Sequence, residues 1–127
     1  MRSTVLRLTC FLLLAGCEGL PPEPGNPYDP SSDIYAPIPP SIYAYPAGPT
    51  IVVVSIHDRS LGEAGFKIER SIGTDSSYVE IGTADANATQ YVDHYSFVSH
   101  QMYYYRARAF SGNRYGEYSI PSGFRFP

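Results

Sequence analysis

Apolar and polar residues alternate with a period of two through most of the chain after Ser41. Between residues 65 and 71, for example, Phe66 and Ile68 alternate with Lys67 and Glu69. Successive side chains of a strand point to opposite faces of a sheet, so this pattern predicts half-buried β-strands rather than amphipathic helices. The predicted strands cover residues 41–46, 50–58, 65–71, 77–82, 89–93, 102–110 and 115–126.

Turn-forming residues separate these strands, as in the Pro-Ala-Gly-Pro stretch at residues 46–49. Seven short strands joined by turns predict an all-β fold, an immunoglobulin-like seven-stranded β-sandwich with two antiparallel sheets. The predicted core consists of Val52, Val54, Ile56, Phe66, Ile68, Ile81, Tyr91, Phe97, Tyr103, Tyr105, Ala107 and Ala109.

The first residues follow a different pattern. Arg2 and Arg7 accompany an apolar run at residues 8–14, and two small residues, Ala15 and Gly16, follow it. A short positive region, an apolar region and small residues in this order are typical of an export signal. The run is also much shorter than the roughly 20 residues that a membrane-spanning helix needs. Residues 1–16 are therefore predicted to be a signal peptide.

The Leu-Ala-Gly-Cys stretch at residues 14–17 resembles the lipobox of bacterial lipoprotein precursors. The resemblance implies that the sulfur of Cys17 receives a diacylglyceryl lipid and that cleavage leaves Cys17 as the first residue. Two or more acyl chains anchor a protein stably to a membrane. Glu18, in place of an aspartate, implies the outer membrane of the bacterial cell envelope. An ordinary signal peptide, cut near Gly19, is the alternative.

Residues 17–36 are predicted to be the lipidated Cys and a proline-rich tether. Eight prolines fall between Pro21 and Pro40. Because proline fixes φ and lacks an N–H donor, this linker is predicted to be disordered, extended and polyproline-like, with a reach of roughly 60 Å. Tyr28 and Tyr35 are predicted to be solvated side chains of this spacer, and docking on the domain or on a partner is the alternative.

Several segments of the strand region resemble the fibronectin type III domain. GFKIERS (65–71), ATQYVD (88–93), YYYRARA (103–109) and NRYGEYS (113–119) match its motifs in the correct order, and PPSIYA (39–44) resembles its opening strand. The resemblance implies one such domain over residues 37–127.

The same resemblance assigns roles to single residues. Ile56 stands where the family has a core tryptophan, and Phe97 and Tyr105 are expected to fill part of the space that this loss leaves. Tyr103 matches the tyrosine-corner position, so its hydroxyl is expected to bond a nearby backbone group. Asp93 is expected to cap a turn.

Charge and cysteine content exclude some classes of function. The formal charge is −3, and removal of Arg2 and Arg7 with the signal leaves seven basic against twelve acidic residues, or −5. An acidic balance argues against nucleic-acid binding, which needs a basic face. Cys10 would be lost with the signal, so the single remaining cysteine excludes an intramolecular disulfide.

The histidines do not predict a catalytic centre. His57 and Asp58 are neighbours in a strand and point to opposite faces, while Ser55 shares the face of His57 without an oxyanion turn around it. His94 and His100 flank one connection, where a zinc site is the alternative to solvated loop histidines. No enzyme activity, metal or small-molecule cofactor is predicted.

Five residues on the outer face of strands 65–71 and 102–110 form the candidate partner-binding face: Lys67, Glu69, Tyr104, Arg106 and Arg108. Glu69 is expected to pair across the strands with Arg106 or Arg108. A solvated, self-paired face and a face that binds a sugar ring or a peptide are both left open.

The expected function is that of a membrane-anchored envelope lipoprotein whose single fibronectin type III-like domain serves protein or polysaccharide binding, adhesion or spacing. The alternative is a non-catalytic carbohydrate-binding module that acts in trans with a polysaccharide hydrolase.

Overall fold

The computed structural model describes residues 25–27, 29–32 and 35–127. Cys17, Glu18 and Tyr28 lie outside the described residues. The strands are β1 (Ser41–Gly48), β2 (Ile51–His57), β3 (Gly65–Ile72), β4 (Val79–Asp85), β5 (Gln90–His94), β6 (Met102–Ser111), β7 (Arg114–Tyr115) and β8 (Ser122–Arg125). Within the described part, no helix is long and apolar enough to cross a membrane.

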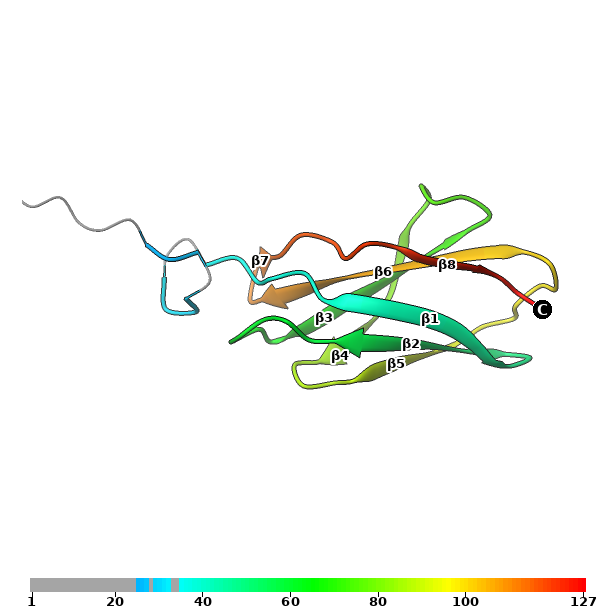
Figure 1. The fold of residues 1–127 in the computed structure, drawn as a ribbon, viewed down its shortest axis with the longest axis horizontal. Helices are drawn as coiled ribbons and strands as arrows, with labels where there is room; N and C mark the ends of the chain where they lie inside the picture. Colours follow the sequence, from blue (N-terminus) through cyan, green and yellow to red (C-terminus); the bar gives the residue numbers. More distant parts are fainter. Residues whose placement is uncertain (1–24, 28, 33–34) are drawn as a thin grey trace, which may run out of the picture.

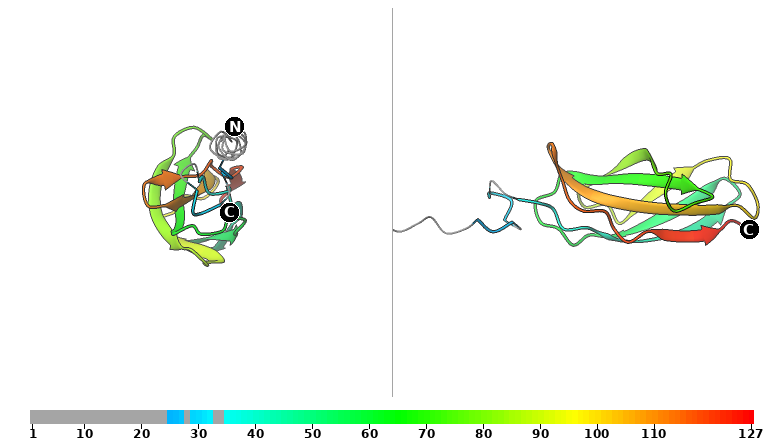
Figure 2. Two further views of the ribbon diagram at one scale, coloured as in Figure 1. Left: turned by 90° about the vertical axis from the view of Figure 1, so that its left-hand side faces the viewer. Right: turned by 90° about the horizontal axis from the view of Figure 1, so that it is seen from above.

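These strands form two antiparallel sheets that pack face to face, as the end-on view in Figure 2 shows. One sheet has the order β1-β2-β5, and the other has the order β4-β3-β6-β7 with β8 also paired to β6. Figure 1 shows that the strands run along the long axis of the molecule, with the docked N-terminal segment at one end and the C-terminus at the other. The predicted all-β sandwich is confirmed.

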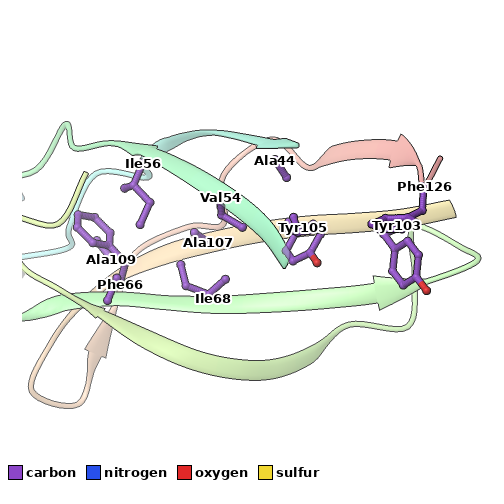
Figure 3. Packing of buried hydrophobic residues seen from close by; sticks show 12 residues of the cluster. Ala44, Val54, Ile56, Phe66, Ile68, Tyr103, Tyr105, Ala107, Ala109 and Phe126 are labelled. Carbon is purple, nitrogen blue, oxygen red and sulfur yellow. The ribbon is translucent and has the colours of Figure 1, made fainter. Parts of the chain in front are cut away.

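The core lies between the two sheets, where alternate residues of the central strands meet (Figure 3). Val52 and Val54 of β2 are fully buried against Phe66, Ile68 and other side chains of the opposite sheet. The prediction holds for most of the core, while Ile81, Tyr91 and Phe97 are only partly buried. Ala44, Ala84 and Phe126 are buried core residues that the sequence analysis did not name.

The last predicted strand is divided into β7 and β8 by an irregular stretch. In this stretch the N–H of Ser119 donates to the carbonyl of Ala107, and the Ser119 hydroxyl accepts the N–H of Ala107 at 2.9 Å. Pro121 follows and has no N–H to continue a ladder. Along β6, a side-chain hydrogen bond to the Ser119 hydroxyl therefore takes the place of part of the regular backbone pairing, and Pro121 cannot continue that pairing.

Contrary to the expectation from the sequence, Phe97 does not fill the space beside Ile56. Its ring packs on Tyr103 and Phe126 with centroid distances of 5.0 Å in both cases, near the C-terminal end of the sandwich. Ile56 lies toward the other end of the core, near Phe66 (Figure 3). The two residues are therefore too far apart along the core for one to compensate for the other.

Two predicted single-residue roles have different outcomes. The hydroxyl of Tyr103 accepts the backbone N–H of Val98 at 2.8 Å, so the tyrosine-corner prediction is confirmed. The turn-capping prediction for Asp93 is wrong, because its buried carboxylate accepts hydrogen bonds from Arg70 at 2.6 Å and Tyr105 at 2.7 Å. Asp93 lies inside β5 and joins the two sheets.

The described part of the proline-rich segment is not extended. The N–H of Ala36 donates to the carbonyl of Pro27 at 2.8 Å, which closes the chain into a loop. Tyr35 is only 6% exposed, and its hydroxyl donates to the carbonyl of Leu61. The prediction of a solvated Tyr35 is therefore wrong, and the alternative of docking on the domain is correct for this residue.

Candidate functional site

The five predicted face residues do come together on the outer surface of β3 and β6. The register places Glu69 opposite Arg106 and Lys67 opposite Arg108. The Arg106 guanidinium donates to the Glu69 carboxylate at 2.9 Å, so the expected cross-strand pair is formed. Glu69 is 7% exposed, and its charge is largely withdrawn from solvent by this pairing.

Tyrosine rings cover the two arginines of this face. The Arg106 guanidinium lies 3.6 Å from the ring centroid of Tyr118 and 4.1 Å from that of Tyr78. The Arg108 guanidinium lies 4.2 Å from the centroid of Tyr115 and 4.7 Å from that of Tyr118. Cations and rings thus alternate along the face, an arrangement in which each contact stabilises by about 0.5–1 kcal/mol where it is exposed.

Burial raises the pKa values of two of these tyrosines, Tyr78 and Tyr118. Burial, and then the hydrogen bond to Asp75, raise the pKa of Tyr78 well above its usual range. Burial, and then a contact with the Glu69 carboxylate, raise the pKa of Tyr118. Both rings therefore stay neutral at physiological pH and remain suitable partners for the guanidinium groups.

The remaining members of the face are also engaged within the molecule. The Lys67 ammonium donates to the Thr83 hydroxyl at 3.2 Å and lies 4.8 Å from the centre of the Phe110 ring. Tyr104 lies so close to Gly123 that a Cβ there would be 2.5 Å from its ring. Apart from the buried Arg108 Nε, which has no hydrogen-bond partner among the described residues, this face consists mainly of groups that satisfy one another.

The outer face of the β1-β2-β5 sheet has the opposite character. Tyr43 is 65% exposed and Tyr45 38% exposed, and their rings are nearly parallel with centroids 5.8 Å apart. Tyr45 lies opposite Val53, which lies opposite Val92 on β5. The other outward-facing residues are Ser41, Ile51, Ser55, His57, Gln90 and His94.

This surface, called the tyrosine face below, has no Asp, Glu, Lys or Arg among the outward-facing residues of its three fully described strands. This face was not among the sites predicted from the sequence. The usable signal was the alternation in residues 41–46, where both tyrosines fall on the side opposite the buried Ala44. A lack of charge on the polar side of three strands is visible only after the strands have been placed together.

Within the part of the chain that the structure describes, the histidines are not brought together with other catalytic groups. Ser55 and His57 face outward on β2, and the Asp58 carboxylate accepts the N–H of Ser60 at 2.9 Å. Among residues 25–27, 29–32 and 35–127, no three His, Cys, Asp or Glu side chains lie close enough together to hold a metal ion.

A groove of about 450 Å³ lies between the start of β1 and the stretch that precedes β8. Its walls include Pro40, Ile42, Arg59, Tyr118 and Pro121. The lining contains no carboxylate and no histidine.

Several solved structures share this architecture. An Fn3-like protein from Clostridium thermocellum is similar over 73% of this chain and 96% of its own, with 22% sequence identity and a TM-score of 0.57. The fold is that of the fibronectin type III-like β-sandwiches. The FN1-FN3 domains of chicken CNTN1 match 72% of this chain with 17% identity and a TM-score of 0.61.

A β-1,2-glucanase from Parabacteroides distasonis is similar over 72% of this chain, with 16% identity and a TM-score of 0.62. The chain spans 33% of the CNTN1 structure and 13% of the glucanase, so in both it corresponds to one module of a larger protein. No protein-family model matches the sequence, and no curated protein matches it either. At these identities the likeness concerns the fold, which hosts many functions.

Proposed function

We propose that this chain is a lipid-anchored protein of the bacterial cell envelope that displays one fibronectin type III-like domain for binding, adhesion or spacing. The lipobox-like residues 14–17 support this assignment, with a diacylglyceryl group on Cys17 and the outer membrane as the destination given by Glu18. The partner is an envelope protein or a polysaccharide. The domain acts without catalysis and without a small-molecule cofactor.

The observation that carries the binding role is the contrast between the two sheet faces. On the β3-β6 face, a partner has to displace tyrosines that already cover Arg106 and Arg108. On the tyrosine face, Tyr43 and Tyr45 are exposed and no formal charge has to lose its water. Desolvating an uncharged face costs much less than desolvating a charged one, so this face is the better contact surface.

The glucanase match favours a second candidate, an accessory module that works in trans with a polysaccharide hydrolase. Exposed rings with nearby hydroxyl and amide groups suit a neutral sugar chain, and Tyr43 lies opposite Ser55, which lies opposite Gln90. Aromatic rings offer a large apolar surface at low entropic cost. The two candidates differ in the partner and use the same face.

The test is retention of the mature chain from residue 17 onward, produced without the signal and with Cys17→Ser, on insoluble neutral polysaccharides and on envelope fractions. We expect the double variant Tyr43→Ser/Tyr45→Ser to weaken retention at least about tenfold, which corresponds to about 1.4 kcal/mol. Tyr104→Ser is the matched control, because it removes a tyrosine from the other sheet and should leave retention unchanged.

Two results would contradict this assignment. Retention that is lost in Tyr104→Ser and kept in the double variant would place binding on the β3-β6 face. No retention of any form on any material would remove the binding role and leave a spacer.

A further inference from the structure

The segment before β1 packs on one end of the sandwich, here called the docking pole. The pole consists of the loop at residues 58–64 and the hairpin at residues 111–116, which Figure 1 places at the same end as the incoming chain. Tyr35 is buried there and bonds the Leu61 carbonyl. The ring of Pro30 fits against Gly62, where a Cβ would lie 2.5 Å from the proline Cγ.

Further contacts attach the segment to both parts of the pole. The Arg114 guanidinium donates to the carbonyl of Ser32 at 2.9 Å, and the Ser60 hydroxyl donates to the carbonyl of Ile38 at 2.9 Å. The backbone of Pro37 lies against Gly116, where it leaves no room for a Cβ. Hairpin and loop therefore hold the segment from two sides.

The segment also has internal order. Besides the bond from Ala36 to Pro27, the N–H of Tyr35 donates to the carbonyl of Ser32 at 3.1 Å, and the N–H of Ser31 donates to the Asp29 carboxylate at 2.9 Å. Prolines within such a loop lower the entropy that docking has to overcome. The segment is thus folded into a loop and also fits closely against the docking pole. A free tether would have neither property.

We infer that the described residues between 26 and 40 (26–27, 29–32 and 35–40) form a collar that fixes the orientation and height of the domain on the membrane. This inference rests on the proposed lipid anchor at Cys17. With the collar docked, the docking pole faces the bilayer and the end of the chain at Pro127 points away from it. The strands run from pole to pole (Figure 1), so the tyrosine face stands upright and is open from the side.

The collar also limits the distance to the membrane. Eight residues lie between Cys17 and Asn26, and the nine steps along the chain, at no more than about 3.4 Å each, span at most about 30 Å. Without docking, the chain from Cys17 to Ser41 would reach about 80 Å by the same arithmetic. A short connection and a docked collar hold the domain close to the lipid surface with one pole toward it.

The test uses the mature lipidated chain in vesicles that contain an acceptor dye on the lipid headgroups. Single cysteines for a donor dye replace Asn113 at the docking pole or Ser96 in the loop at the opposite end. We expect energy transfer to be several-fold stronger from position 113 than from position 96. The double variant Tyr35→Ser/Arg114→Ser should release the collar and bring the two efficiencies together, while Ile120→Ser, an exposed control, should not.

Equal transfer from both positions in the vesicle-bound protein would overturn the inference. A second readout, hydrogen exchange at the Ala36 amide of the same mature chain, tests docking apart from anchoring. Protection of this amide that is lost on Tyr35→Ser supports the collar, and an unprotected amide overturns it. If the Ala36 amide is protected but the protein does not associate with vesicles, the lipid anchor is contradicted. The inferred orientation on the membrane is then contradicted as well.

Discussion

At the scale of single residues, Asp93 joins the two sheets. It comes from β5, while its partners Arg70 and Tyr105 come from β3 and β6 of the other sheet. The Arg70 guanidinium in turn lies 3.8 Å from the centre of the Tyr95 ring. A carboxylate with little solvent contact is tolerated here because a charge and a hydroxyl both compensate for its lost water.

Replacement of Asp93 by alanine should strongly destabilise the domain. The Asp93 and Arg70 side chains are 6% and 13% exposed, so the variant leaves a largely buried cation without its partner. We expect the free energy of unfolding to fall by about 3 kcal/mol, measured by urea denaturation. Glu117→Ala, which removes an exposed carboxylate, should change it by less than about 0.5 kcal/mol. Equal effects of the two variants would show that the ion pair contributes nothing to stability.

Tyr105 makes the domain sensitive to alkaline pH. Burial, and then the hydrogen bond to the Asp93 carboxylate, raise the pKa of Tyr105 far above its usual range. A group whose pKa is raised by folding stabilises the folded state below its unfolded pKa, and this contribution is lost as pH rises above about 10. Denaturation curves collected across this pH window should therefore show falling stability, with a shallower slope for Tyr105→Phe. An identical slope in both proteins would contradict the assignment.

At the scale of elements, the C-terminal end of the sandwich is closed by aromatic rings. Phe126 stacks on Phe97, and backbone bonds link Phe126 to His100 and Gln101 at 2.8 Å each. Phe124 stacks parallel to Tyr105, with an angle of 3° between the rings. The end of β8 is thereby tied to the loop between β5 and β6.

Phe126→Ala should cost about 3 kcal/mol of stability, because it empties a buried site between two aromatic rings. Ile120→Ala is the matched control from the same terminal segment. Ile120 is 88% exposed, so its truncation should change stability by less than about 0.5 kcal/mol. Thermal unfolding followed by circular dichroism measures both. A melting temperature of Phe126→Ala equal to that of the parent would contradict the packing described here.

The sequence predicted what depends on alternation and missed what depends on contacts between distant segments. Glu69 and Arg106 could be paired because each lies on the polar side of a strongly alternating strand. Tyr35 stands among prolines with no periodic pattern around it, so nothing local indicated its burial. Asp93 was read as a turn residue, because the approach of Arg70 from another sheet leaves no trace in its own neighbourhood.

At the scale of the whole molecule, the domain has two unlike faces and two unlike poles. One face is closed by an ion pair and by arginine–tyrosine contacts, and the other exposes two tyrosines on an uncharged sheet. One pole holds the segment that leads back toward Cys17, and the other holds the C-terminus. In the proposed arrangement the membrane lies beyond the first pole, so the tyrosine face remains available to a partner in the envelope.

The most direct test of the central claim is mass spectrometry of the N-terminal peptide of the protein purified from bacterial membranes. The account predicts a peptide that begins at Cys17 and carries a thioether-linked diacylglyceryl group. A peptide that still contains Met1, or one that begins after Cys17 and bears no lipid, would contradict it.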